Sequence, residues 1–287
     1  MSSILWTNRT SAGVFDSYPG YKHLNKRRIR ECHSAEQAAL SSSTLAVFTN
    51  QWAADVACEN YSFDQRKVRV IPYGANLLSR LTNDDIAECL HRRDAREYEL
   101  LFVGTEWNRE GTQIAIDTTS VMRARGVNVH LTLVGCIPPP AVSLPEYVTI
   151  IGKIDKSTRR GYALLASLYM QSHLLILPSR GETCAGALSL ASAYGVPALC
   201  TSLGGNSTLI KNGINGQIFS LEAGATDYAE YALELLGDPQ KYTAMCWSSF
   251  ERFQTDLNWD VAVSRLITEI KKVLPAASEA YACTRAS

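Results

Sequence analysis

Short apolar runs alternate with amphipathic stretches along most of this 287-residue chain. Runs rich in branched or aromatic side chains predict strands at 100–103, 129–134, 148–151, 174–177 and 198–200. Apolar positions at helical spacing predict helices from about residue 111, across 164–170 and after residue 185. Strands that alternate with helices in this order favour a parallel sheet covered by helices on both faces.

The first 76 residues repeat this alternation on a smaller scale, with about three strands and two or three helices. Apolar runs at 45–48 and 68–71 predict two strands, and a helix that begins near Asn50 lies between them. Another helix is predicted across 24–40. The basic cluster at its start, from Lys22 to Arg30, fits either a solvated helix face or a surface that meets phosphate or lipid.

A charged stretch without periodicity, "TNDDIAECLHRRDAREYE" at 82–99, follows "IPYGAN" at 71–76 and predicts a connection between two units with room for one short helix. Three helices are expected near the C-terminus. The last of them runs from Trp259 to Leu274. Its predicted apolar stripe consists of Trp259, Ala262, Val263, Leu266, Ile267, Ile270 and Leu274.

Composition narrows the class of protein. Apolar residues make up 46% of the chain and charged residues 20%, as in an ordinary soluble protein, and we predict a cytoplasmic one. The formal net charge is zero, which argues against a nucleic-acid partner held by overall charge. The eight cysteines lack the paired spacing of metal ligands and fit a reducing compartment. Of the five scattered histidines, His173 precedes an apolar strand and is interpreted as structural.

Candidate chemistry gathers at two strand ends, because ligands bind open parallel sheets beyond the carboxyl ends of the strands. Glycine-marked loops follow two predicted strands, "VGTEWNREGT" at 103–112 and "PSRGETCAGA" at 178–187. A helix that begins with small residues presents unpaired N–H groups, which suit a diphosphate. Neither loop matches the dinucleotide fingerprint or the P-loop, so NAD-type and NTPase functions lose their main support. Glycine at such turns is equally explained by backbone geometry alone.

The second loop belongs to a longer pattern. Pro178 and Ser179 end a strand, Glu182 follows, and the next helix leads to Gly-Val-Pro at 195–197. The segments "LLFVGTEWNREGTQIA", "LTLVGCIPP", "TSLGGNSTLIKNGINGQIF" and "LNWDVA" accompany it. From Trp6 to Leu274 the chain resembles the GT-B glycosyltransferases of the retaining, nucleotide-sugar-dependent group called family 4.

The resemblance implies an α/β fold in three parts. Residues 77–260 are expected to form a Rossmann-like, doubly wound parallel sheet, the C-terminal GT-B domain that binds the nucleotide-sugar donor. Residues 1–76 are expected to form a partial second Rossmann-like domain on the acceptor side. Residues 261–287 would supply a helix that returns to the N-terminal part, followed by a tail.

The resemblance also implies roles for individual residues. Glu182 would contact the transferred sugar's hydroxyls, and Arg109 is the cation of the first loop that could stabilise the leaving diphosphate. The predicted donor-binding residues are Gly104, Thr105, Gly152, Ile154, Thr183, Cys184, Ala185, Gly186 and Ala187. In such enzymes the leaving phosphate is thought to take the acceptor's proton, so neither a protein nucleophile, a metal nor a cofactor is expected. The donor would be a UDP- or GDP-sugar.

Three departures from the family pattern weaken this expectation. Leu190 stands where the family usually has a second acid for the nucleotide's ribose. Glu110 stands in place of a phosphate-binding lysine, and Thr105 in place of its partner arginine. One misplaced charge about 5 Å from a phosphate costs about 3 kcal/mol at an effective dielectric of about 20. The resemblance also begins partway through the family's N-terminal domain, so the chain is expected to be truncated there.

Two functions therefore stay open. The chain is either a retaining hexosyltransferase that acts on a glycan or lipid acceptor, or a non-catalytic, truncated or degenerate relative. As an interaction module, such a relative would use residues 1–76 as its docking surface. With either function, three further partners stay open: a membrane surface that the chain contacts peripherally, a second copy of the chain, and a partner chain that covers the N-terminal part.

Overall fold

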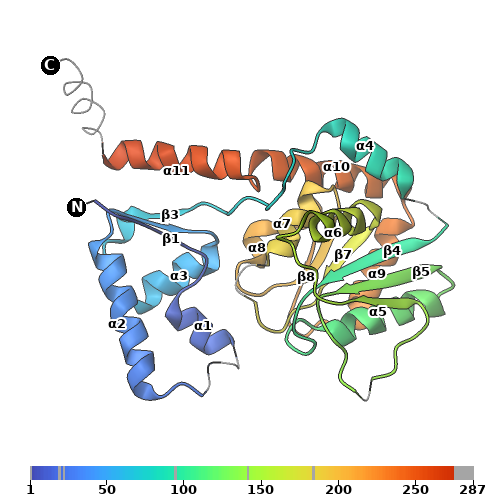
Figure 1. Ribbon diagram of the computed structural model, residues 1–287, viewed down its shortest axis with the longest axis horizontal. Coiled ribbons are helices and arrows are strands. Elements are labelled where there is room, and N and C mark those ends of the chain that lie inside the picture. Colours follow the sequence, from blue (N-terminus) through green and yellow to red (C-terminus); the bar gives the residue numbers. More distant parts are fainter. Residues whose placement is uncertain are drawn as a thin grey trace.

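The computed structural model describes residues 2–18, 21, 23–93, 96–140, 142–182 and 185–274. Its elements form two parallel sheets that lie side by side, with one long helix, α11 (Trp259–Val273), running from one to the other (Figure 1). The predicted α/β class with Rossmann-like parallel sheets is confirmed.

The N-terminal sheet has three strands in the order β1–β2–β3, namely β1 (Ile4–Thr7), β2 (Leu45–Phe48) and β3 (Val68–Val70). The helices α1 (Ser11–Ser17) and α2 (Lys26–Ser42) connect β1 to β2, and α3 (Gln51–Asn60) precedes a short 3-10 turn and β3. All four β2 residues are buried because both faces of the sheet are covered. Ala46 and Phe48 pack toward the helices on one face.

The opposite face of β2 receives α11. Leu45 and Val47 share a buried cluster with Ile71 and with Ala262 of this helix. The predicted apolar stripe of α11 was wrong in part, because Trp259, Val263 and Ile267 stay 38%, 41% and 46% exposed. Only the Ala262 side of the stripe is covered by the sheet, since one helix face cannot bury a stripe this wide against three short strands.

The C-terminal sheet has six parallel strands in the order β6–β5–β4–β7–β8–β9. The strands are β4 (Tyr98–Val103), β5 (Val129–Val134), β6 (Val148–Ile151), β7 (Leu174–Leu177), β8 (Ala198–Thr201) and β9 (Gly216–Phe219). The chain builds outward from β4 to β6 and then returns to place β7 on the other side of β4. This reversal makes the gap beyond β4 and β7 the switch point at which doubly wound sheets bind ligands.

The helices of this sheet are α4 (Asn83–Arg92), α5 (Thr112–Ala124), α6 (Arg159–Gln171), α7 (Gly186–Ala193), α8 (Asn206–Leu209), α9 (Ala225–Leu236) and α10 (Pro239–Thr255). Right-handed crossovers in opposite directions put α5 on one face and α6 and α7 on the other. Consistent with this, α5 packs beside α9, and α7 packs beside α10. Both faces of the sheet are therefore covered, as its nearly continuous apolar strands require.

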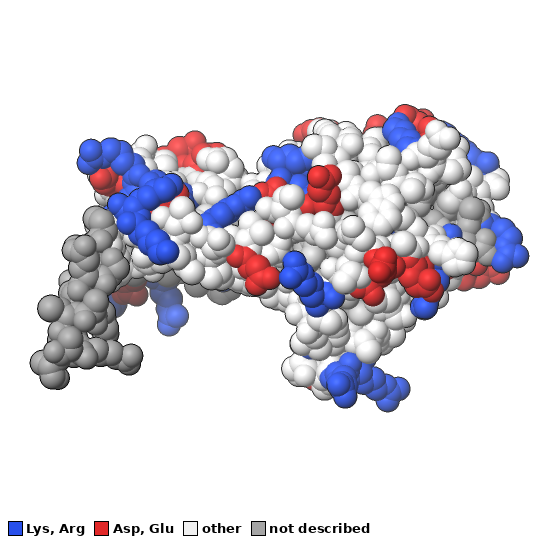
Figure 2. Space-filling view, turned by 90° about the horizontal axis from the view of Figure 1, so that it is seen from above, with Lys and Arg blue, Asp and Glu red and all other residues white. Residues whose placement is uncertain are grey.

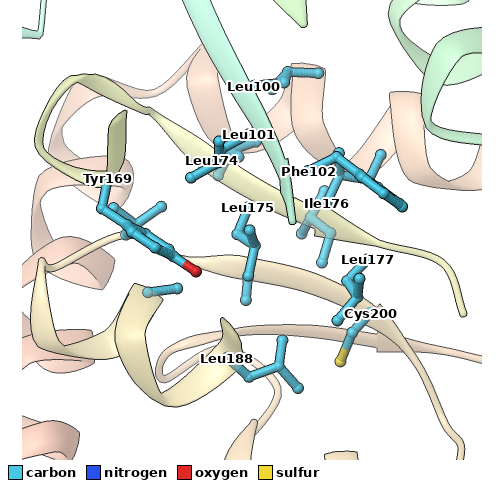
Figure 3. Close-up of a cluster of buried hydrophobic side chains, with 14 of the residues drawn as sticks. Leu100, Leu101, Phe102, Tyr169, Leu174, Leu175, Ile176, Leu177, Leu188 and Cys200 are labelled. Carbon is cyan, nitrogen blue, oxygen red and sulfur yellow. The ribbon is translucent and has the colours of Figure 1, made fainter. Parts of the chain in front are cut away.

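The core lies between these layers. Figure 3 shows Leu100, Leu101 and Phe102 of β4 beside the four leucine and isoleucine residues of β7, with Tyr169 of α6 and Leu188 of α7 against them. The Tyr169 hydroxyl donates to the carbonyl of Ala187, at 3.2 Å, and its ring stacks on Tyr194. These contacts fix where α7 begins.

Most elements predicted in the second half are confirmed within a few residues, and α4 is the short helix expected in the connection. The predicted count of about three strands and two or three helices in residues 1–76 agrees with β1–β3 and α1–α3, although no position was predicted for β1 or α1. The four-residue α8 was not predicted. The predicted division after residue 76 falls in the connection between β3 and α4, whereas that after residue 260 falls inside α11.

Charged side chains of both signs are interspersed on the face seen in Figure 2, as the zero net charge suggests. No helix among the described residues is both long and apolar enough to cross a bilayer. The six cysteines within the described part of the chain are free thiols. His173 is buried, and its ring Nδ1 accepts from the Glu99 amide at 3.0 Å, which agrees with a structural role.

Arg93, at the end of α4, is a buried cation that ties three helices together. Its guanidinium donates to the carbonyls of Tyr194 and Gly195 at the end of α7, at 2.8 and 2.9 Å, and to that of Met170 in α6 at 3.3 Å. Carbonyls at the end of a helix carry partial negative charge, so the cation both satisfies hydrogen bonds and offsets that charge.

We predict that Arg93→Met lowers the free energy of unfolding by roughly 3 kcal/mol, because it leaves buried carbonyls without donors. The matched control is Arg92→Met, which removes only the exposed pair with Glu88 and is expected to cost less than about 1 kcal/mol. Urea denaturation of both variants measures the difference. Equal midpoints for the two variants would contradict a clamping role for Arg93.

Glu99, at the start of β4, makes stability depend on pH. Burial, together with the nearby charge of Glu97, raises the pKa of Glu99 to about 7. An acid with a raised pKa in the folded state favours folding in its protonated form, so stability is lost as pH rises from the ordinary value of 4.5 through about 7. We therefore expect Glu99→Gln to gain thermal stability relative to the natural protein at pH 8 but not at pH 4.5. A pH-independent difference would contradict this.

Candidate functional site

A cavity of about 810 Å³ opens beyond the carboxyl ends of the C-terminal strands and reaches the N-terminal part. Gly104 and Thr105 follow β4, Gly135 follows β5, and Leu177 ends β7. From the other side come Asn8 after β1, Tyr18 after α1 and the connection from Tyr73 to Leu78. The cavity therefore lies at the switch point of one sheet and is closed by residues of the other.

The two glycine-marked loops are joined to each other along one wall. Gly111 caps α5 with φ of +74°, and a side chain there would stand 2.0 Å from the carbonyl oxygen of Pro178. The Arg180 amide donates to the Arg109 carbonyl at 2.7 Å. Gly111 is thus required by backbone geometry, which is the alternative explanation that the sequence left open for the loop glycines. The same close approach brings the two loops into one site.

Arg109 points inward from the first loop. Its side chain is 14% exposed and donates to the carbonyl of Gly181 at 2.6 Å. The guanidinium also pairs with Glu106 at 3.0 Å and with Glu110 at 2.5 Å, both in its own loop. Two carboxylates therefore already offset this single positive charge.

Glu110 is the most deeply placed charged group of the cavity wall, with a side chain only 9% exposed. Its carboxylate lies against Gly104, where a side chain would come within 1.7 Å of Oε2. Burial and the charge of Glu182 raise the pKa of Glu110, and Arg109 acts in the opposite direction. Burial is the larger influence, because taking a carboxylate out of water penalises its charged form.

Tyr18 reaches this group from the N-terminal part. Its ring lies under the Arg109 guanidinium, 5.1 Å from the guanidinium carbon, and its hydroxyl donates to Glu182 Oε1 at 3.5 Å. A residue from α1's end thus contacts both loops of the C-terminal sheet. Glu182 lines the cavity, and its carboxylate is oriented by the hydrogen bond from Tyr18 of the N-terminal part.

The start of α7 forms the cavity floor beside Glu182. Ala185, Gly186 and Ala187 line the cavity, and a side chain added at Gly186 would meet nothing within 4 Å. No side chain caps this helix start. The first amides of a helix have no partner within the helix, so this end offers donors and partial positive charge to an anion.

The fold has counterparts among solved structures. The chain superposes with a TM-score of 0.69 on sucrose-phosphate synthase from Thermosynechococcus elongatus, at 21% identity over 96% of this chain and 68% of that one. It superposes with a TM-score of 0.67 on the Anabaena protein HepE in complex with UDP-glucose, at 14% identity over 94% and 72%. The chain has the GT-B fold.

Sequence comparison agrees with the GT-B assignment. Residues 97–238 match the family model described as glycosyl transferases group 1. The chain is 29% identical over 259 residues to D-inositol 3-phosphate glycosyltransferase 1 of Catenulispora acidiphila, covering 84% of this chain and 60% of that relative. It is 28% identical over 113 residues to the GDP-mannose-dependent alpha-mannosyltransferase of Corynebacterium glutamicum, covering 38% and 26%. The chain thus spans at most about three-fifths of the length of these relatives.

Most of the predicted site residues meet in this GT-B cavity. Those that line it are Glu182, Arg109, Gly104, Thr105, Ile154, Ala185, Gly186 and Ala187. Gly152, which directly follows β6, is not among the lining residues. Thr183 and Cys184 lie outside the described residues. Leu190 also lines the cavity, so the missing second acid is replaced by an apolar surface there.

Sequence reasoning missed several lining residues. They are Asn8, Tyr18, Tyr73, Lys156, Tyr162, Tyr194 and Trp259. Lys153 and Lys156 lie next to the predicted Ile154 and add the cavity's other positive charges. Tyr194 follows Leu190 by one helical turn, a spacing that could have flagged it. Tyr18 carried no such signal, because α1 was not predicted.

The pairing of Arg109 with Glu110 predicts a pH-dependent stability effect. Removing Arg109 leaves a buried carboxylate without its cation and raises the pKa of Glu110 further, so the cost of the lost charge pair is absent while Glu110 is protonated and grows as pH rises above its pKa in the natural protein. We expect Arg109→Ala to lose about 3 kcal/mol at pH 8 and much less at pH 5. Urea denaturation at both values measures it, and adding Glu110→Gln to the variant is expected to abolish the difference. A loss of equal size at both pH values would show that the charge of Glu110 is unimportant.

Proposed function

We propose that this chain binds a nucleotide sugar in the cavity and serves transfer of the sugar to an acceptor with retention of anomeric configuration. The observation that carries the proposal is the convergence of Glu182, Arg109 and the open start of α7 at the switch point between β4 and β7. Binding of a sugar diphosphate requires a carboxylate that accepts hydrogen bonds from the sugar's hydroxyls, a cation beside the diphosphate, and backbone amides without partners.

In this proposal the diphosphate lies at the start of α7, beside Arg109. Glu182 accepts hydrogen bonds from the sugar's hydroxyls, and Tyr18 holds the Glu182 carboxylate in place. Ile154 and the lysines near it lie on the side expected for the nucleoside. The apolar Leu190 offers the ribose no hydrogen bond, and the nearest hydroxyls in the cavity lining are those of Ser189, which precedes it on α7, and Tyr194, which follows the helix.

The chemistry that follows is displacement on one face of the sugar. The leaving diphosphate departs from the anomeric carbon, and the acceptor hydroxyl attacks from the same face and gives its proton to a departing phosphate oxygen. Charge develops on that phosphate, so donors that are already fixed around it lower the barrier. Arg109 meets this condition because its position is held by Gly181 and Glu110 before any ligand binds.

Relatives suggest which donors to test. One solved structure with this fold holds UDP-glucose, and one sequence relative is named for dependence on GDP-mannose. We propose a UDP- or GDP-hexose as donor and a glycan or lipid as acceptor for this chain. Contact with a membrane surface through the acceptor belongs to the same proposal.

The second candidate is a non-catalytic relative, and two observations favour it. Glu110 places a carboxylate where the donor's diphosphate would lie, and it also consumes part of the Arg109 charge. Leu190 removes the expected ribose contact. In that case the chain keeps the GT-B fold and acts through binding or interaction.

Calorimetric titration with UDP, GDP and ADP separates the two candidates. We expect one nucleotide to bind at micromolar strength and Arg109→Ala to weaken it at least tenfold, through loss of a charge-assisted contact. The matched control is Arg180→Ala, which removes a cation of the neighbouring loop that does not line the cavity. Glu182→Gln is expected to lower the affinity for the corresponding nucleotide sugar and to leave the affinity for the nucleoside diphosphate unchanged. Absence of binding by all three nucleotides would overturn the donor-site proposal.

A further inference from the structure

The short helix α1 is held at its first turn by side chains of two other elements. Ser11 donates its amide to Glu36 Oε2 of α2 at 2.6 Å, and Ala12 donates its amide to the hydroxyl of Tyr61, which follows α3, at 3.3 Å. Amides at a helix start have no partner within the helix. A helix of seven residues is too short to be stable by itself, so these contacts help to decide where α1 lies.

Tyr61 is the centre of a group that we call the α1 anchor, which consists of Tyr61, Glu36 and His33. Tyr61 is buried, and its hydroxyl donates to Glu36 Oε2 at 2.7 Å. The hydroxyl has one proton, so in its contact of 2.9 Å with His33 Nδ1 the ring nitrogen is the donor. Burial and Glu36 raise the pKa of Tyr61, which keeps that proton in place. With the amide of Ala12, every hydrogen-bonding position of the hydroxyl is used.

The other end of α1 brings Tyr18 to the donor cavity. In Figure 1, α1 lies on the side of the N-terminal part that faces the C-terminal sheet. The amide of Tyr18 donates to the carbonyl of Val14 at 3.0 Å, so its backbone continues the helix. A side chain at Gly13 would come within 2.6 Å of the Trp52 ring in α3. This close packing leaves α1 little room to shift, so the placement of its start also sets the placement of Tyr18.

Aromatic rings form a second connection between the α1 anchor and Tyr18. Phe15 of α1 packs edge to face with His33, with ring centroids 5.5 Å apart, and with Tyr21 at 5.9 Å. Tyr21 packs in the same way with Tyr18 at 6.4 Å. Aromatic pairs favour such geometry at these separations. The anchor is therefore linked to Tyr18 through packed rings as well as through the helix backbone.

Resting on the proposed function, we propose that Tyr61 and Glu36 are positioning residues of the donor site. They hold α1 so that the Tyr18 ring lies against the Arg109 guanidinium and the Tyr18 hydroxyl donates to Glu182. The N-terminal part thereby shapes the site for the donor sugar before an acceptor is present.

The two contacts of Tyr18 depend on the α1 anchor to different degrees. Arg109 is also held by the carbonyl of Gly181 and by two carboxylates of its own loop, none of which belongs to the N-terminal part. Glu182 receives its hydrogen bond from Tyr18 across the cavity. Loss of the anchor should therefore affect the residue proposed to bind the sugar more than the cation proposed to bind the diphosphate.

The test is calorimetric titration of the full chain with UDP, GDP and ADP, and with UDP-glucose, GDP-mannose and ADP-glucose. The natural protein is compared with Tyr61→Phe, with Tyr18→Phe and with the variant that carries both changes. The matched control is Tyr228→Phe. Tyr228 is a buried tyrosine of α9 whose hydroxyl hydrogen-bonds to Thr201 at 3.0 Å, and it does not line the cavity. A general loss of stability would lower affinity in Tyr228→Phe as much as in Tyr61→Phe.

We expect Tyr61→Phe to lower the affinity for the nucleotide sugar roughly fivefold and to change that for the nucleoside diphosphate less than about twofold. Tyr18→Phe is expected to give the same pattern. Adding Tyr61→Phe to Tyr18→Phe is expected to cause no further loss, because both changes act through the hydrogen bond to Glu182. Tyr228→Phe is expected to leave both affinities unchanged.

Glu36 gives a second test at a side chain that is only partly buried. Glu36→Ala removes the oxygen that accepts from Ser11 and Tyr61, and it is expected to show the same selective loss for the nucleotide sugar. Glu36→Gln keeps an acceptor oxygen at this position and is expected to bind within about twofold of the natural protein.

Equal losses for nucleotide sugar and nucleoside diphosphate in Tyr61→Phe would overturn the positioning role while leaving donor binding intact. So would losses that multiply when Tyr61→Phe is combined with Tyr18→Phe. If the natural protein binds none of the six ligands, the donor site itself is overturned, and the positioning role with it.

Discussion

The ion pair between Arg109 and Glu110 is the interaction on which the arrangement of the site depends. The same guanidinium reaches Glu106, the carbonyl of Gly181 and the ring of Tyr18, so it joins the loops after β4 and β7 to the N-terminal part. Because Glu106 and Glu110 both pair with this guanidinium, its single positive charge is already offset where the two loops meet.

The two sheets give this cluster its setting. Reversal of strand order between β4 and β7 creates the crevice. Gly111 lets the loop after β4 pack directly against Pro178 of the loop after β7, and the two loops together form one wall of the crevice. On the far side, α11 covers the N-terminal sheet, and its first residue Trp259 also donates to Asn76 at 2.9 Å. The helix that joins the two parts thus begins at the cavity rim, which couples their relative placement to the shape of the site.

The departures from the family pattern acquire physical meaning in this setting. Leu190 makes its part of the cavity wall apolar, and Glu110 places a buried carboxylate beside Arg109. Both residues remove a contact that the proposed donor would use, so they bear directly on the choice between a glycosyltransferase and a non-catalytic relative.

The sequence by itself determined the α/β class, the strands β2 to β8 and the loops that meet in the cavity, because apolar periodicity and strand-end glycines are local signals. It also located Glu182, Arg109 and the start of α7. Only the tertiary structure decided that Tyr18 enters the site, that Gly152 stays outside its lining, and that Trp259, Val263 and Ile267 of the α11 stripe remain exposed. Contacts between residues far apart in the sequence depend on how layers pack, and a periodicity read within one segment carries no information about them. The direction of the Arg109 side chain belongs to the same group, since it is set by Gly181 in another loop.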